Sequence, residues 1–247
     1  MKLERGSILN FFNYMTKKVD QAPSISLDEL IQESGGIESL YLVYVDILKG
    51  FCEEGPLASD RVNEMVKPVA NLSERLVSKG IPAENLIFLN DHHPEDAVEF
   101  GAFAPHCRRS TKEAEIVDAL KPYYEKEGAQ IYRKNATNGL FGVNQDGKRF
   151  FEWLEHIFQQ KKSTFVIVGD CTDLCIYQNA MGIRLFANEK NASSVNVVVP
   201  ISHVRTYDIS VEQAEQFNIY AHDADFMDVV FLYHMQMNGI KVVSTLL

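Results

Sequence analysis

The amino-acid sequence predicts an α/β fold in which one mostly parallel sheet is covered by helices on both faces. From residue 39 onward, short runs rich in Val and Ile alternate with amphipathic segments, the pattern of strands joined by crossover helices. Each run is nearly continuous in apolar residues, as expected of a strand covered on both faces. We therefore expect a single three-layer α/β/α domain over residues 39–247.

Six strands are expected in this sheet, at Leu40–Asp46, Asn85–Leu89, Ala129–Arg133, Thr164–Gly169, Val195–Pro200 and Ile240–Ser244. Between them, apolar residues recur at spacings of three and four over 62–72, 150–158 and 226–233, which predicts helices with one buried face. Residues 1–38 precede this domain. An apolar grouping over residues 8–15 and the later Ser26-Leu-Asp-Glu sequence predict a helical N-terminal arm.

The composition argues against several classes of protein. The chain of 247 residues has 24 Lys and Arg against 34 Asp and Glu, and the resulting formal charge of -10 repels nucleic acids and anionic lipids. No apolar run approaches the roughly 20 residues that span a bilayer, and the first ten residues do not resemble a secretion signal. Four cysteines are too few for disulfide bonds to be the main stabilisation of a chain of this length. We expect a cytoplasmic protein with reduced thiols that binds neither nucleic acid nor membranes.

Polar residues follow several expected strands, at the sheet edge where ligands bind in open α/β proteins. Asp46 ends the first strand, Lys134 follows the third, and Cys175 follows the fourth. Because the carboxyl ends of parallel strands meet at one edge, we expect a carboxylate, an amine and a thiol to converge there.

These three residue types suit nucleophilic catalysis. Cys175 lies where the chain turns from a strand into a helix, and a helix N-terminus lowers the pKa of a thiol. Asp46 can take the thiol proton, and Lys134 can hold the charged groups in place. Taken alone, these residues fit better as a buried structural Cys, an Asp that caps a turn and a surface Lys, so their joint placement carries the interpretation. Cys171 lies four residues before Cys175, which does not match the Cys-x-x-Cys spacing of a redox pair.

A second group of residues suits a metal ion. The second strand ends in Asn90-Asp-His-His, and Glu99 and His106 follow in a short segment. Asp, His and Glu are ligands for divalent metals, and one loop can bring them together. By spacing alone, a His-His-Pro turn with solvated acids explains the same residues.

In this order and spacing, the motifs resemble the cysteine hydrolases of the isochorismatase-like fold, and among them the nicotinamidases. The resemblance runs from about residue 39 to the C-terminus. The segment Val43–Gly55 resembles the family's first strand with its catalytic Asp, Lys134 matches the catalytic Lys, and Val168–Cys175 matches the turn that carries the nucleophile.

The resemblance implies a catalytic mechanism. It assigns Asp46, Lys134 and Cys175 to hydrolysis of a small-molecule amide, with nicotinamide as the best single substrate, through a thioester on Cys175. Backbone N–H groups of Cys171 and Cys175 are expected to bind the oxyanion, next to a cis peptide bond between Asp170 and Cys171.

The resemblance also implies a metal site and a substrate pocket. The expected ligands of one divalent ion, either zinc, manganese or iron, are Asp91, His93, Glu99 and His106. Position 97 is Ala where the family usually has a His, and Glu99 matches the Glu that some members use instead. The expected aromatic walls of the pocket are Phe51, Phe103 and Phe141.

Some residues depart from the family pattern and keep alternatives open. Leu48 replaces a frequent Gln or Asn, and Arg108-Arg109-Ser110 replaces a Gly-Thr turn, so that the two arginines favour an anionic substrate. One alternative is a metal-free hydrolase of the same fold that acts on a ureido, carbamoyl or enol-ether substrate. Another is a binding module without catalysis, against which the three convergent residues argue.

The N-terminal arm, residues 1–38, contains no Cys or His and no acidic residues at ligand-like spacing. Its apolar residues are expected to be buried, because burial of each such side chain stabilises the folded state by roughly 1.5 to 3 kcal/mol. The alternatives are an arm that packs on its own domain, one that packs against another subunit and a disordered tail, and we expect a homo-oligomer.

Overall fold

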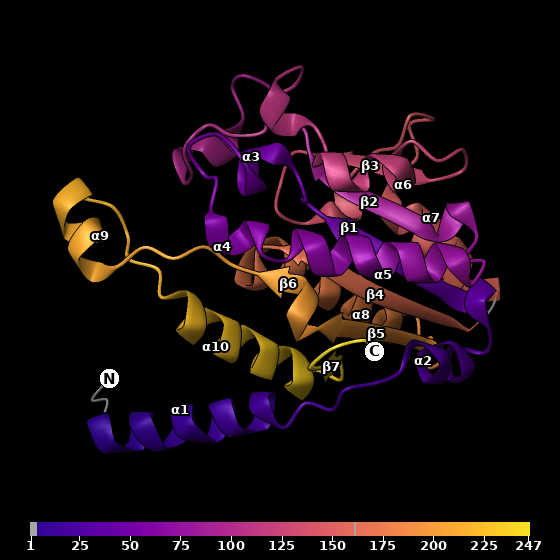
Figure 1. Ribbon diagram of the computed structural model, residues 1–247, viewed down its shortest axis with the longest axis horizontal. Coiled ribbons are helices and arrows are strands. Elements are labelled where there is room, and N and C mark those ends of the chain that lie inside the picture. The colour runs from indigo at the N-terminus through magenta and orange to yellow at the C-terminus, as the bar shows by residue number, and fades with distance from the viewer. Residues whose placement is uncertain (1–3, 161) are drawn as a thin grey trace.

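The computed structural model describes residues 4–160 and 162–247 and has the expected three layers (Figure 1). A seven-stranded sheet lies in the middle, formed by β1 (Leu40–Val45), β2 (Leu86–Asp91), β3 (Gln130–Lys134), β4 (Ser163–Asp170), β5 (Val195–Pro200), β6 (Val204–Arg205) and β7 (Lys241–Val243). The strand order is β3-β2-β1-β4-β5-β7, with β6 beside β4, and these pairings are parallel. The predicted fold class is confirmed.

The six expected strands are present, and two findings extend the prediction. β6 was not expected, because two residues are too few to show an apolar pattern. β2 and β3 continue further than predicted, so Asp91 and Lys134 are the last residues of their strands rather than parts of the loops that follow.

Helices cover both faces of the sheet. They are α1 (Arg5–Asp20), α2 (Leu27–Ser34), α3 (Lys49–Cys52), α4 (Asp60–Asn63), α5 (Val66–Ser78), α6 (Lys121–Tyr124), α7 (Phe150–Gln160), α8 (Tyr177–Glu189), α9 (Val211–Phe217) and α10 (Ala224–Met237). Of these, α7 and α10 match the helices predicted over 150–158 and 226–233, whereas the single helix predicted over 62–72 is divided between α4 and α5 by a turn at residues 64–65. No helix among the described residues has both the length and the apolar character needed to cross a bilayer.

The two sides of the sheet hold two separate apolar cores, because successive residues of a strand face opposite sides. In β1, Leu42 and Tyr44 join the core beneath α5, whereas Val43 and Val45 join the core beneath α7, α8 and α10. Both cores leave the carboxyl ends of β1 to β4 at one edge, where the polar candidate residues lie.

The N-terminal arm forms the expected helices α1 and α2. Ser26 begins the second helix, and its hydroxyl accepts a hydrogen bond from the backbone N–H of Glu29. Helix α1 lies along α10 (Figure 1), where the rings of Phe12 and Phe226 stack with 5.0 Å between their centroids. The arm therefore packs on its own domain.

Candidate active site

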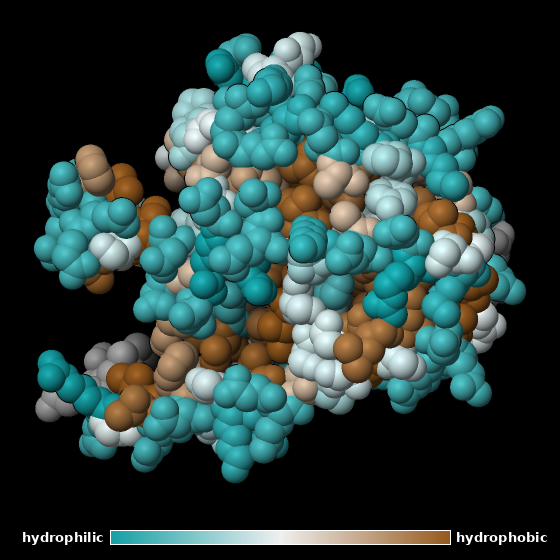
Figure 2. All heavy atoms as spheres, viewed as in Figure 1, coloured by the Kyte–Doolittle hydropathy of each residue, from teal (hydrophilic) through white to brown (hydrophobic). Residues whose placement is uncertain are grey.

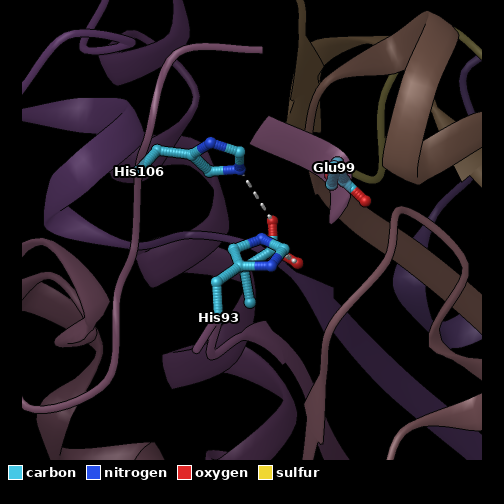
Figure 3. A group of neighbouring side chains, drawn as sticks. His93, Glu99 and His106 are labelled. Carbon is cyan, nitrogen blue, oxygen red and sulfur yellow. Dashed lines mark ion pairs between the residues drawn. The ribbon is translucent and has the colours of Figure 1, made fainter. Parts of the chain in front are cut away.

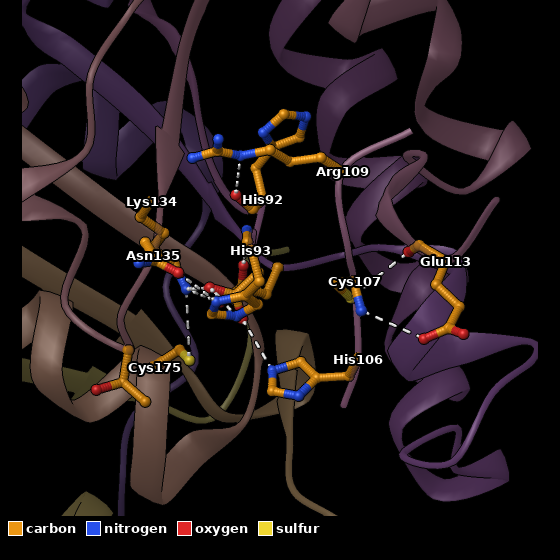
Figure 4. Close-up of polar contacts among 12 residues, drawn as sticks. His92, His93, His106, Cys107, Arg109, Glu113, Lys134, Asn135 and Cys175 are labelled. Carbon is orange, nitrogen blue, oxygen red and sulfur yellow. Dashed lines mark hydrogen bonds and ion pairs between the residues drawn. The ribbon is translucent and has the colours of Figure 1, made fainter. Parts of the chain in front are cut away.

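The structure brings Asp46, Lys134 and Cys175 together at the carboxyl edge of the sheet. Figure 4 shows Lys134 beside Cys175. Lys134 Nζ lies 2.6 Å from Asp46 Oδ2, 2.6 Å from Asp91 Oδ1 and 3.7 Å from Cys175 Sγ. These side chains are all buried. One amine thus contacts two carboxylates and the thiol, which is the convergence that the strand ends predicted.

The backbone around β1 and β4 sets the position of Asp46. Gly169 in β4 has a φ of 125°, and a Cβ there would lie 2.0 Å from the carbonyl oxygen of Val45. The glycine thus lets β4 approach the point where the chain leaves β1. Asp46 itself has a φ of 53°, and its Oδ1 accepts a hydrogen bond from the backbone N–H of Asp91 at 2.8 Å. The carboxylate is fixed to the ends of two strands.

Burial and charge set the protonation of these groups. Burial and the charge of Asp91 raise the pKa of Asp46 to about 6, although Lys134 opposes this rise. Burial alone would lower the pKa of Lys134, but the two carboxylates raise it above its ordinary value.

The electrostatics correct one expectation. A helix start was expected to lower the pKa of Cys175, whereas burial raises this pKa despite the nearby charge of Lys134. The raised pKa favours the thiol of Cys175 over its thiolate. One carboxylate oxygen each from Asp46 and Asp91 lies within 4.8 Å of its sulfur.

The four predicted metal ligands also lie together. One ligand atom from each of Asp91, His93, Glu99 and His106 lies within 4.8 Å of the others. Figure 3 shows the rings of His93 and His106 close together, with a ring nitrogen of His106 directed at a carboxylate. His93 Nε2 is 3.4 Å from Asp91 Oδ1, and His106 Nε2 is 3.6 Å from Asp91 Oδ2. A shared carboxylate thus faces two imidazoles.

The outer contacts of the two histidines fit a metal site. His106 Nδ1 lies 2.8 Å from the carbonyl oxygen of Ala104, which can only accept, so Nδ1 carries the proton and Nε2 keeps its lone pair. His93 Nδ1 lies 2.8 Å from Asn135 Oδ1 in the same way. His93 Nε2 is buried and forms no hydrogen bond among the described residues. Metal-binding histidines are typically oriented by such contacts.

His92 belongs to a different surface from its neighbour. Its ring lies beside Arg109, apart from the cluster around His93 (Figure 4). Arg109 Nε donates a hydrogen bond to the backbone oxygen of His92 at 3.2 Å, and Arg108 pairs with Glu95 at 3.0 Å. These contacts do not test the anionic substrate that the two arginines favour, which stays a prediction.

Aromatic rings surround the histidines. The Phe51 ring lies 5.3 Å from the His106 ring and the Phe103 ring lies 6.4 Å from it, measured between centroids. Phe100, which the sequence did not single out, lies 5.3 Å from His93 and 5.6 Å from His106. Phe141 differs from these, because 64% of its surface is exposed. Its role as a pocket wall stays a prediction.

The nucleophile turn, residues 171–176, joins β4 to α8. The expected cis peptide bond between Asp170 and Cys171 is present. Asn179 donates a hydrogen bond to the backbone oxygen of Cys175 at 2.8 Å. Asp173 accepts hydrogen bonds at both oxygens, from Thr206 Oγ1 at 2.5 Å and from His222 Nε2 at 2.8 Å.

His222 makes a contact with Asp173 that the sequence did not reveal. It lies 49 residues from Asp173 and belongs to no motif, so it was given no role. Only the tertiary fold brings its ring against the turn that carries Cys175.

Leu48, a departure from the family pattern, is fully buried in the core beneath α5.

The chain is similar to known proteins in sequence and in fold. The model of the isochorismatase domain matches residues 41–186, which is more than half of the chain. Nicotinamidase 1 from Arabidopsis thaliana is 31% identical over 216 residues, covering 83% of this chain and 86% of the relative.

Solved structures share the fold at lower identity. N-carbamoylsarcosine amidase from Thermoplasma acidophilum matches with a TM-score of 0.58 at 21% identity, over 83% of this chain and 95% of that one. The pyrazinamidase of Pyrococcus horikoshii in complex with zinc matches with a TM-score of 0.55 at 21% identity, over 83% of this chain and 98% of that one. By its domain match and its curated relative, the chain belongs to the isochorismatase family of hydrolases.

Proposed function

We propose that this protein is a metal-dependent cysteine amidohydrolase that converts nicotinamide and water into nicotinate and ammonia. The contact of Lys134 with Asp46, Asp91 and Cys175 is the observation that carries this proposal. The similarity to a curated nicotinamidase at 31% identity supports the choice of substrate.

The first half of the reaction acylates Cys175. Asp46 removes the thiol proton, and the sulfur forms a bond to the amide carbonyl carbon. The carbonyl oxygen becomes an oxyanion, which backbone N–H groups of Cys171 and Cys175 stabilise. When the carbon–nitrogen bond breaks, Asp46 returns the proton and ammonia leaves. Lys134 stays charged, because Asp91 remains a carboxylate beside it while the proton moves between Cys175 and Asp46.

The second half releases the acid. Asp46 takes a proton from a water molecule, whose oxygen attacks the thioester carbon. The carbon–sulfur bond then breaks, and the proton returns to the sulfur of Cys175. The products are the carboxylic acid and the enzyme with its starting thiol and carboxylate.

Asp91, His93, Glu99 and His106 would hold one divalent ion, and their mixed imidazole and carboxylate set suits zinc, manganese or iron. Such an ion would supply a Lewis acid that polarises a bound oxygen or orients a ring nitrogen. Asn135 and the backbone oxygen of Ala104 hold the two imidazoles in the tautomer that can bind it. Phe51, Phe100 and Phe103 line the adjacent surface with apolar rings.

Ammonia release from nicotinamide tests the proposal. The wild type is expected to release ammonia, and Cys175→Ala is expected to release none. Cys52→Ala removes a thiol that is buried in α3 and serves as the matched control, because it also loses a buried sulfur. Mass spectrometry after reaction with an electrophilic substrate analogue should find the adduct on Cys175 and not on Cys52.

The alternative activity predicts different results. If purified protein holds no metal and hydrolyses a ureido, carbamoyl or enol-ether compound but not nicotinamide, the metal-free hydrolase replaces this proposal. Near-native turnover by Cys175→Ala would refute both, because each needs the same nucleophile.

A further inference from the structure

Exposed apolar side chains gather at one end of the molecule. More than half of the large ones in the described chain come from α1, from residues 206–223 or from the start of α10; they are Ile8, Leu9, Phe11, Tyr14, Val211, Phe217, Ile219, Tyr220 and Phe226. We name residues 206–223 the excursion, because they leave the sheet after β6 and return at α10. A monomer rarely exposes so much apolar surface in one region.

The excursion projects from the body of the molecule. Figure 1 shows α9 standing clear of the other helices, on the same side as the N-terminal end of α1. Figure 2 shows open space between these two projections, both of which carry apolar atoms at their surface. At the tip, the side chain of Tyr220 is 95% exposed and that of Phe217 is 64% exposed.

The excursion is nevertheless well ordered by its own contacts. Ile209 and His222 exchange two backbone hydrogen bonds of 2.8 Å that close its base. Ser210 and Gln213 form a capping box that begins α9. Because these contacts form the backbone conformation of the excursion before any partner binds, docking of its apolar tip loses little conformational entropy.

Helix α1 presents a second preformed apolar surface. Its Met15 and Val19 are buried, so that this side faces the domain. The rings of Phe11 and Tyr14 lie 6.0 and 6.1 Å from the ring of Tyr233 on α10, yet about half of each of these two side chains is exposed. The domain therefore covers only one side of this aromatic cluster.

The two surfaces are opposite in charge. Helix α1 carries Arg5, Lys17 and Lys18 against a single acid, Asp20, and the two acids of the adjoining α10, Asp225 and Asp228, pair with Arg61. The excursion has no Lys or Arg, and its acids are Asp208, Glu212, Glu215 and Asp223. Since both surfaces lie at the same end of one chain, a two-fold axis beside them brings each excursion to the α1 of the other copy.

We propose that the excursion docks on α1 and α10 of a second copy of this chain, so that two copies form a reciprocal dimer. Apolar contact of the tip with the half-covered rings supplies most of the affinity. The complementary charges select this pairing over an excursion meeting another excursion, because two acidic surfaces repel.

The same contact reaches the proposed active site. The base of the excursion holds Thr206 and His222, which bind both oxygens of Asp173 in the nucleophile turn. Docking therefore reduces the motion of the segment that carries Cys175. This consequence depends on the proposed function, whereas the dimer itself does not.

Mass in solution tests the dimer without any assay of activity. By sedimentation equilibrium, the wild-type protein is expected to have twice the 28.0 kDa mass of one chain. Replacing both Phe217 and Tyr220 by Ser should yield monomers. Leu185→Ser is the matched control, because Leu185 is 52% exposed on α8, and it should leave the dimer intact.

A second variant tests the charge pairing. Glu212→Lys combined with Glu215→Lys alters only exposed side chains of α9 and should weaken self-association at least tenfold while the circular dichroism spectrum stays unchanged. A monomeric wild type, or a dimer that resists both double variants, would overturn the proposal. If the dimer dissociates as expected but the wild type releases no ammonia, only the proposed function fails.

Discussion

The ring of His222 is bound to Asp173 as a charged group. Its Nε2 lies 2.8 Å from Asp173 Oδ2, and its Nδ1 lies 2.8 Å from the carbonyl oxygen of Tyr207. Both of these oxygens accept hydrogen bonds, so both ring nitrogens carry protons. The Tyr207 ring stacks on the imidazole with 4.0 Å between centroids, which favours a cation. A buried ion pair thus joins the excursion to the nucleophile turn.

The charge of His222 makes stability depend on pH. Burial opposes the charged ring, but the hydrogen bond and charge of Asp173, the backbone of Tyr207 and the charge of Asp208 raise the pKa of His222 above its ordinary 6.5. Because the folded pKa is raised, this stabilisation is complete below pH 6.5 and is lost as the pH rises through the folded value.

Replacement of this residue should therefore be costly at low pH. His222→Gln is expected to lower the free energy of unfolding by about 1.5 to 3 kcal/mol at pH 6, which is the usual contribution of a hydrogen bond to a charged group. Urea denaturation at pH 6 and pH 9 should show this difference shrinking at the higher pH. His234→Gln alters an exposed histidine and should change neither value. A loss of equal size at both pH values would contradict the charged state.

Lys134 is expected to be essential for stability as well as for turnover. Lys134→Met keeps the length of the side chain but leaves Asp46 and Asp91 buried without their cation, so it should destabilise the fold by about 3 to 5 kcal/mol. Turnover should fall at least 100-fold. Arg133→Met changes the neighbouring exposed residue on the other face of β3 and should alter stability by less than about 0.5 kcal/mol. Thermal unfolding and ammonia release measure both effects.

His93 and His92 should differ in metal binding. His93→Ala is expected to lose the bound metal because its buried Nε2 faces Asp91. His92→Ala should keep the metal, because that ring lies beside Arg109 instead. Metal content by mass spectrometry of purified protein, before and after treatment with a chelator, separates the two. The opposite pattern would move the ligand by one residue.

Asn135 should tune the same site without touching the ion. Its Oδ1 fixes the ring of His93 through Nδ1, and such outer contacts typically change metal affinity 10- to 100-fold. Asn135→Ala is therefore expected to weaken metal binding within that range, as measured by competition with a chelator. An unchanged affinity would show that His93 needs no such support.

Gly169 is expected to tolerate no side chain. In Gly169→Ala, the new Cβ would lie 2.0 Å from the Val45 carbonyl oxygen, and the φ of 125° is unfavourable for alanine. We expect a loss of at least about 3 kcal/mol in the free energy of unfolding. Gly147→Ala is the control, because Gly147 also has a positive φ but open space, and it should lose about 1 kcal/mol. Similar losses in both variants would show that β4 can move away from β1.

The sequence determined the architecture because the signals for it are local. Continuous apolar runs mark strands that are buried on both faces, and spacings of three and four mark helices with one buried face, so each element can be recognised from its own residues. The position of Asp46, Lys134 and Cys175 followed from the same information, because the ends of parallel strands meet at one edge. The ligand set of Asp91, His93, Glu99 and His106 needed the family resemblance, since its spacing alone also fits a solvated turn.

The tertiary structure alone decided what depends on residues far apart in the chain. No local pattern distinguishes His222, because its role comes from Asp173 49 residues away. No residue pattern showed that burial would keep Cys175 a thiol, since the pKa depends on everything packed around the sulfur. The projection of the excursion, like the half-covered rings of α1, follows from how complete elements pack. Periodicity specifies which side of an element is apolar, and only the packed fold determines which apolar sides remain uncovered.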